Sequence, residues 1–153
     1  MASTQTPSSS QLVFVDSSVV IAAAVSSRGR AGELMQLGAV GWIELAVSDL
    51  VIAEARRNLE KKAPHAIAVF DEFIEFGRLT LSKPTSALIV DVAKVVAGKD
   101  APIIAGAITA GARLIASYDR KHLLSRAPEI WEALQVQVST PDSILAVLSL
   151  AGE

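Results

Sequence analysis

The sequence predicts an α/β protein with a five-stranded parallel sheet and helices on both faces. Patterns typical of strands and of helices alternate along the chain, which is the rhythm of βαβ units, and parallel sheets are normally covered on both sides. The 153 residues, 51% hydrophobic and 20% charged, fit one compact domain with a full core. We therefore expect a single domain over residues 12–153, preceded by a disordered tail over residues 1–11.

Short apolar runs predict the strands, and longer runs with apolar residues at helical spacing predict the helices. The predicted strands cover residues 12–15, 43–47, 79–82, 114–117 and 136–139. The predicted helices cover residues 18–26, 31–37, 49–62, 65–76, 86–97, 101–110 and 144–150. Gly77 and Gly111 follow helices, and Pro102 lies in a first helical turn, so these residues support the boundaries.

Four carboxylates spread along the chain predict one acidic pocket. Asp16 and Asp119 each follow a predicted strand, and ligands of open α/β sheets bind beyond the carboxyl ends of the strands. Glu54 lies between the apolar stripe and the charged side of its helix, and Asp100 precedes an apolar helix. Each acid also has an ordinary explanation: Asp16 and Asp100 as helix caps, Glu54 as a solvated charge, Asp119 as a turn residue.

The composition argues against several other kinds of site. With no cysteine and only two histidines, His65 and His122, the chain offers no disulfide and a poor supply of zinc ligands. The formal net charge of −2 shows no basic domain of the kind that binds nucleic acid. Residues 101–112 form the longest uncharged and mostly apolar stretch, which is shorter than the roughly 20 residues of a membrane-spanning helix. Because residues 1–11 also lack a basic or apolar targeting pattern, we expect a cytoplasmic protein without membrane contact.

The residues around the four acids form an ordered set of motifs. Residues 13–18 read Val-Phe-Val-Asp-Ser-Ser, residues 99–104 read Lys-Asp-Ala-Pro-Ile-Ile, and residues 114–119 read Leu-Ile-Ala-Ser-Tyr-Asp. Together with Glu54, this set resembles the PIN-domain nucleases, within them the bacterial toxin-like (VapC-like) branch, over residues 12–148. The resemblance implies a three-layer α/β/α sandwich with strand order 3-2-1-4-5. That order would place the first and fourth strands side by side at the topological switch point.

The resemblance also implies a reaction, the hydrolysis of RNA phosphodiester bonds by a metal-dependent endoribonuclease. Asp16, Asp100 and Asp119 would be direct or water-mediated metal ligands, and Glu54 would hold a metal-bound water. Carboxylates that share a pocket repel one another unless a cation compensates, and oxygen ligands suit Mg²⁺ or Mn²⁺ better than zinc. One or two such ions would polarise the phosphate and activate the attacking water. The implied partners are single-stranded RNA, an antitoxin protein and a second copy of the chain.

Two serines would support this site, and two positions depart from the family pattern. Ser17 and Ser117 would orient the carboxylates by hydrogen bonds. Some family members carry a further acid where this chain has Lys121, and an Asn is frequent where Ser18 stands, so the second metal position and the substrate orientation are open. The candidates for phosphate binding, each of which could equally be a solvated surface charge, are Arg28, Arg30, Arg56, Arg57, Lys61, Lys62, Arg120 and Lys121.

Two other functions remain to be compared with the nuclease. A phospho-receiver domain is also five-stranded and acidic, but it needs an acceptor Asp after the third strand, where residues 79–84 read Leu-Thr-Leu-Ser-Lys-Pro. A catalytically inactive PIN fold that binds RNA or protein is the stronger alternative. Trp42 and Trp131 could stack on bases, but their apolar neighbours favour core or interface packing, and the two histidines are expected to be non-catalytic.

Overall fold

A computed structural model describes residues 12–151 of the chain and shows one five-stranded sheet. All its strands run parallel, in the order β3-β2-β1-β4-β5. The strands are β1 (Leu12–Val15), β2 (Glu44–Ser48), β3 (Leu79–Ser82), β4 (Leu114–Ala116) and β5 (Gln137–Ser139). The predicted fold class and strand order are confirmed, while the predicted disordered tail, residues 1–11, lies outside the described residues.

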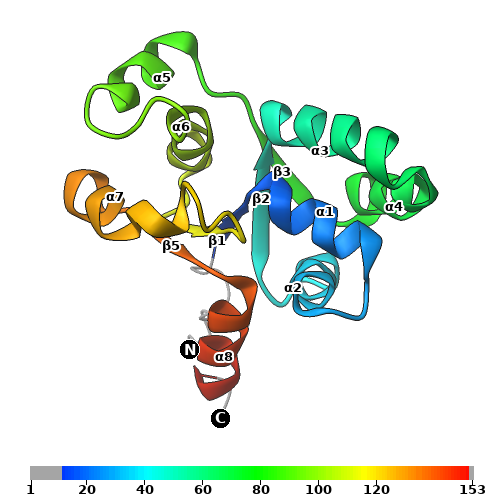
Figure 1. Cartoon of the computed structure of the whole chain (residues 1–153). Helices are drawn as coiled ribbons and strands as arrows, with labels where there is room; N and C mark the ends of the chain where they lie inside the picture. The colour runs from blue at the N-terminus through cyan, green and yellow to red at the C-terminus, as the bar shows by residue number, and fades with distance from the viewer. Residues whose placement is uncertain (1–11, 152–153) are drawn as a thin grey trace.

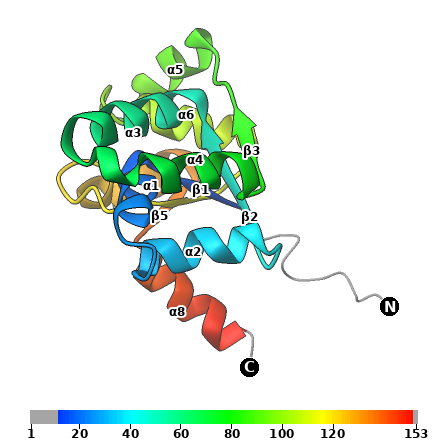
Figure 2. The same ribbon diagram turned by 90° about the vertical axis from the view of Figure 1, so that its right-hand side faces the viewer.

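Helices cover both faces of the sheet and give the molecule three layers (Figure 1). One face carries α1 (Ser17–Val25), α2 (Arg30–Ala39), α3 (Asp49–Lys62) and α4 (Ile67–Phe76), with the short 3-10 helix η2 (Pro64–Ala66) between the last two. The other face carries α5 (Ser86–Ala93), α6 (Ala101–Ala110) and α7 (Ala127–Leu134), the last preceded by η3 (Leu124–Arg126). The final helix, α8 (Pro141–Ala151), packs against α2 (Figure 2).

The central strand β1 is buried between the two helical layers. Val13, Phe14 and Val15 are at most 1% exposed, as expected for a strand covered on both faces. On the face of α6, Gly106 allows a close approach, because a Cβ atom there would lie 2.9 Å from Phe14 Cζ. The hydroxyl of Ser82 donates to the Gly106 carbonyl at 2.9 Å, which fixes α6 against the sheet. This packing sets the position of the α6 N-terminus, where the third acid of the site lies.

Three helix predictions differ from the structure, and every other predicted boundary lies within two residues of it. Helix α7 was not predicted: it has only eight residues and Pro128 in its first turn, although its apolar residues do gather on one side. Helix α5 ends at Ala93 instead of residue 97, since the chain must turn within residues 94–100 for α5 to pack on α6. Helix α8 begins at Pro141 instead of residue 144, because the Thr140 hydroxyl caps the helix by accepting a hydrogen bond from the backbone amide of Ser143 at 3.2 Å.

Two tryptophans are not core residues. Trp42 is 70% exposed and Trp131 is 49% exposed, so core packing is excluded for both, and interface packing and base stacking remain. Among the helices of residues 12–151, none combines the length and the apolar character that a bilayer crossing requires.

Candidate active site

All four predicted acids line one cavity at the carboxyl ends of the central strands. The cavity has a volume of about 470 Å³. We call it the acidic cavity, and its lining consists of Asp16, Ser17, Ser18, Ile21, Glu54, Asn58, Lys99, Asp100, Ile103, Asp119, His122 and Leu123. The acids come from the β1–α1 junction, α3, the turn before α6 and the loop after β4. The fold thus gathers residues separated by up to 103 positions in the sequence.

Asp16 is buried and held by three hydrogen bonds. Its Oδ1 accepts the backbone N–H of Ser17 at 2.8 Å, and its Oδ2 accepts the hydroxyls of Ser18 at 2.9 Å and Ser117 at 2.8 Å. Burial raises the pKa of the Asp16 carboxyl above its usual value, while these hydrogen bonds partly offset the rise. Asp16 is also the N-cap of α1, so the capping explanation and the pocket explanation both hold.

Hydroxyl groups tie the first and fourth strands together at the site. Parallel pairing places Val15 beside Ala116, and the Asp16 amide donates to the Ala116 carbonyl at 3.0 Å. The Ser117 hydroxyl donates to Asp16 and accepts the Asp119 amide at 2.9 Å, so it lies between two of the acids. The Ser18 hydroxyl in turn accepts the Tyr118 amide at 3.0 Å.

These contacts bear on the two serines that were expected to orient the acids. Ser117 makes the expected hydroxyl contact with Asp16, whereas the bond from Ser17 comes from its backbone amide. Ser18 provides the second hydroxyl instead, and sequence reasoning had treated it only as a departure from an Asn. Its position two residues after an acid at a strand end was the available signal.

Asp119 is half-buried and organises the loop after β4. Its carboxylate accepts the His122 amide at 3.1 Å, and its Oδ2 lies 3.2 Å from Nδ1 of the His122 ring. The Asp119 carbonyl also accepts the Leu124 amide at 2.9 Å. The turn explanation is therefore correct for Asp119, which nevertheless faces the acidic cavity together with His122. His65, in contrast, is exposed on η2 and does not line the cavity.

Asp100 is the least exposed of the four acids, with 2% exposure. It occupies the N-cap position of α6, but its side chain makes no capping hydrogen bond. Its Oδ2 has no hydrogen-bond partner, and the nearest cation is Nε of Arg126 at 3.5 Å. Burial raises the pKa of the Asp100 carboxyl, and the positive charges of Arg126 and His122 oppose that rise. Arg126 stands on η3, outside every motif identified in the sequence.

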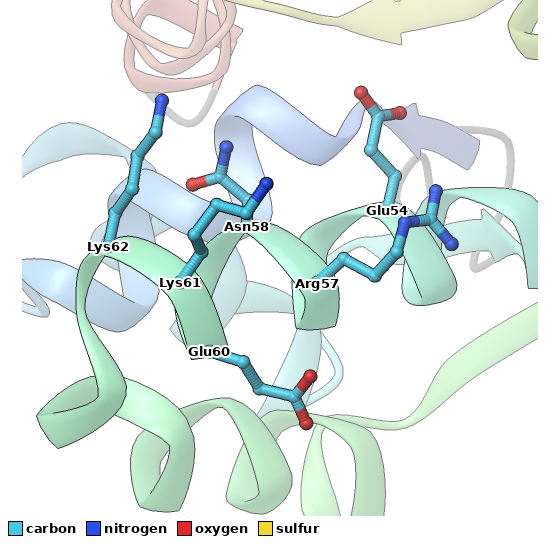
Figure 3. A pocket seen from close by; sticks show the side chains of 6 residues that line it. All are labelled: Glu54, Arg57, Asn58, Glu60, Lys61 and Lys62. Carbon is cyan, nitrogen blue, oxygen red and sulfur yellow. The ribbon is translucent and has the colours of Figure 1, made fainter.

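Glu54 is exposed and connects the acidic cavity with a second hollow along α3. This hollow, about 610 Å³ in volume, is lined by Glu54, Arg57, Asn58, Glu60, Lys61 and Lys62, and we call it the α3 groove. Figure 3 shows that Glu54, Asn58 and Lys62 point from α3 to the same side, whereas Glu60 points away from them. Glu54 and Asn58 line both hollows, so the groove continues directly from the site.

Other predicted phosphate ligands are engaged elsewhere. Arg56 pairs with Asp71 at 2.9 Å and lies over the Phe70 ring at 4.9 Å from its centroid. Arg30 pairs with Glu33 at 2.9 Å on the same helix. Arg57, Lys61 and Lys62 are the candidates that line the α3 groove, and Lys99 adds a cation at the acidic cavity.

The donor set of the acidic cavity fits a hard divalent cation. Asp100 presents a buried carboxylate oxygen without a hydrogen-bond partner, and Asp16 is an oxygen donor already fixed in orientation. Within residues 12–151 no three acidic or histidine side chains are grouped closely enough to be a complete ligand cage. Mg²⁺ does not require such a cage, because it commonly keeps several waters and takes one or two carboxylates.

Comparison with known proteins agrees with the fold. The family model of the PIN domain matches residues 13–130. The chain therefore belongs to the PIN domain family, which indicates a nuclease. A comparison with curated proteins found no significant match.

Three solved structures share the fold at low sequence identity. VapC20 of Mycobacterium tuberculosis, a sarcin-ricin loop cleaving toxin, is 17% identical with a TM-score of 0.55, covering 74% of this chain and 94% of its own. VapBC2 of Rickettsia felis, bound to a DNA fragment from its promoter, is 15% identical with a TM-score of 0.61, covering 85% and 98%. PAE2754 of Pyrobaculum aerophilum is 18% identical with a TM-score of 0.60, covering 94% of both chains. At these identities the likeness concerns the fold.

Proposed function

We propose that the protein is a metal-dependent endoribonuclease that hydrolyses RNA phosphodiester bonds with Mg²⁺ or Mn²⁺. The observation that carries the proposal is the convergence of Asp16, Glu54, Asp100 and Asp119 on one cavity at the carboxyl ends of β1 and β4. Membership of the PIN family supports the same reaction class. In the reaction the water oxygen forms a bond to phosphorus and the bond to the 3′ oxygen breaks, which leaves a 5′-phosphate and a 3′-hydroxyl.

Each acid has a role that suits its surroundings. Asp16, Asp100 and Asp119 would hold the cation, directly or through water, since two are buried and the third is half-buried in the same cavity. When bound, the cation would polarise the phosphate and lower the pKa of the attacking water. Glu54 is exposed at the rim, where it can accept a hydrogen bond from that water. Ser117 fixes Asp16 relative to Asp119, because its one hydroxyl bonds to both residues.

The substrate would continue from the acidic cavity into the α3 groove. Asn58 stands where the two hollows meet, and Lys61 and Lys62 follow on the next turn of the helix. The chain as a whole carries a formal net charge of −2, so attraction for RNA must come from such local groups. A single strand suits an open groove, where its backbone can follow the lysines.

The wider role we propose is that of the toxin in a toxin–antitoxin pair. It is supported by structural likeness to VapC20 and to VapBC2. Binding of an antitoxin and of a second copy of the chain requires apolar surface. Trp42 and Phe76, 70% and 67% exposed, stand just before the paired strands β2 and β3 and provide such surface. We also propose that the protein acts in the cytoplasm, where it would meet RNA.

Cleavage of labelled single-stranded RNA with Mn²⁺ or Mg²⁺ tests the proposal. The purified protein is expected to cut, and Asp16→Asn, Asp119→Asn and EDTA are each expected to abolish cutting. The matched control is Asp91→Asn, an exposed aspartate of α5 that pairs only with Lys94, and it should cut as the unmodified chain does. No cutting of several RNAs by folded, metal-loaded protein would reject the enzyme and favour the RNA- or protein-binding module. DNA of the same sequence tests the preference for RNA.

A further inference from the structure

The contact between Asp100 and Arg126 leaves two buried polar atoms without a hydrogen bond. Within the described part of the chain, Oδ2 of Asp100 and Nε of Arg126 are the buried side-chain atoms of this kind. They lie 3.5 Å apart, which allows charge attraction but is long for a hydrogen bond. A buried carboxylate oxygen without a hydrogen bond lowers the stability of the fold, so a cation placed closer to Oδ2 of Asp100 would be bound favourably.

The surroundings show which charges compete for Asp100. The charge of Arg126 favours the Asp100 carboxylate most, followed by His122 when its ring is protonated, whereas Asp119 and Glu129 add negative charge. The Asp100 side chain is 2% exposed, but that of Arg126 is 42% exposed, so the guanidinium can move toward solvent while the carboxylate cannot. Arg126 also ends the short 3-10 helix η3, where its backbone amide donates to His122 and Leu123 at 3.2 Å.

A divalent cation bound at Oδ2 would satisfy this oxygen and would lie within a few ångströms of the guanidinium. Two cations cannot both occupy that space without strong repulsion. We propose that Arg126 is the resident counter-ion of Asp100 and that it sets the affinity of the acidic cavity for a divalent cation, because guanidinium and metal compete for the same carboxylate oxygen. Arg126 is thus a residue that limits metal binding, and it leaves Oδ2 when the metal enters. This inference rests on the metal-binding part of the proposed function.

Mn²⁺ binding to the full chain, followed by the electron paramagnetic resonance of the free ion, tests the competition without any cleavage. Arg126→Gln removes the charge and is expected to bind Mn²⁺ at least tenfold more tightly than the unmodified protein. Arg126→Lys keeps the charge and should stay within about threefold of it. The matched control is Arg113→Gln, an exposed arginine before β4 that does not line the acidic cavity, and it should leave the Mn²⁺ affinity unchanged.

A second measurement uses the unmodified protein and does not depend on a variant that folds. Labelling with phenylglyoxal, read by peptide mass spectrometry, should increase at Arg126 when Mn²⁺ is added and stay constant at Arg113. Equal affinities of Arg126→Gln and the unmodified protein, or unchanged labelling of Arg126, would overturn the role of Arg126. If Mn²⁺ binding is nevertheless saturable and lost in Asp100→Asn, the metal site of the proposed function survives. No saturable binding in any variant would reject both.

Discussion

Replacing Lys61 and Lys62 by glutamine should weaken RNA binding in a way that depends on salt and on RNA length. The two lysines follow Glu54 on α3 by seven and eight residues, which corresponds to about 10–12 Å at the helical rise of about 1.5 Å per residue. A strand stacked at about 3.4 Å per nucleotide would bring them near the third phosphate from the one that is cut. The affinity for an RNA that ends at the acidic cavity should therefore be unchanged by the substitution of the two lysines.

The magnitude follows from counterion release. Each phosphate contact on a single strand contributes about 0.7 to the slope of log affinity against log salt, so two lost contacts should lower the slope by about 1.4. If the two lysines contribute nothing to RNA affinity near 1 M salt, a slope difference of about 1.4 makes binding about 70-fold weaker at 0.05 M salt and about 14-fold weaker at 0.15 M.

Fluorescence anisotropy with labelled RNA over four salt concentrations measures this slope, on an Asp119→Asn background that prevents cutting. A matched control replaces Lys83 and Arg113, exposed cations that line neither the acidic cavity nor the α3 groove. Equal slopes for the groove variant and this control would refute the path along α3. The path along α3 would also be refuted if the groove variant lost as much affinity for an RNA that ends at the acidic cavity as for a longer RNA.

Three further predictions concern stability. Ser117→Ala removes a hydroxyl that bonds to Asp16, and should lower the free energy of unfolding in urea by about 1–3 kcal/mol. The pKa values of Asp16 and Asp100 are raised in the folded state, so the stability that their protonation contributes is complete below about pH 3.8 and is lost as the pH rises through the folded-state pKa values. Asp100→Asn should make this loss of stability smaller in metal-free protein, as measured by urea titration across pH. Gly106→Val should cost about 1–3 kcal/mol by overpacking, whereas Gly98→Ala, which meets nothing within 4 Å, should not lower the melting temperature.

The sequence was sufficient for the fold because each strand carries its own local signal. The apolar runs 12–15 and 114–117 identified strands β1 and β4, and the acids that follow them marked the edge of the sheet where the acidic cavity lies. The order of the strands came from resemblance to the PIN family, since alternation of helices and strands does not determine which strands are neighbours. Once β1 and β4 are paired, Asp16 and Ser117 must be adjacent, as the hydrogen bond between their side chains shows.

The parts that sequence could not supply depend on side-chain contacts between loops. Arg126 precedes α7, whose apolar residues do gather on one side but over only eight residues, and the contact of Arg126 with Asp100 joins two loops that no periodic pattern connects. Likewise Arg56 reads as one more exposed cation of α3, yet it pairs with Asp71 and packs on Phe70 of the next helix. Arginines and lysines that stabilise the fold cannot be distinguished by residue type from those that face the acidic cavity. Only their tertiary contacts show which is which.

The acidic cavity combines features that lower the stability of the fold with features that would favour binding of a cation. Two buried carboxylates with raised pKa values oppose folding at neutral pH, and one of them has only a long contact with a cation. Three hydrogen bonds hold Asp16, so part of its cost is offset by groups that also fix its orientation. Oδ2 of Asp100 accepts no hydrogen bond, so in the proposed site Asp100 should gain more than Asp16 from binding a cation. A site whose own side chains satisfied every buried oxygen would be more stable and would bind a metal less tightly, so the proposed metal site depends most on the unsatisfied oxygen of Asp100.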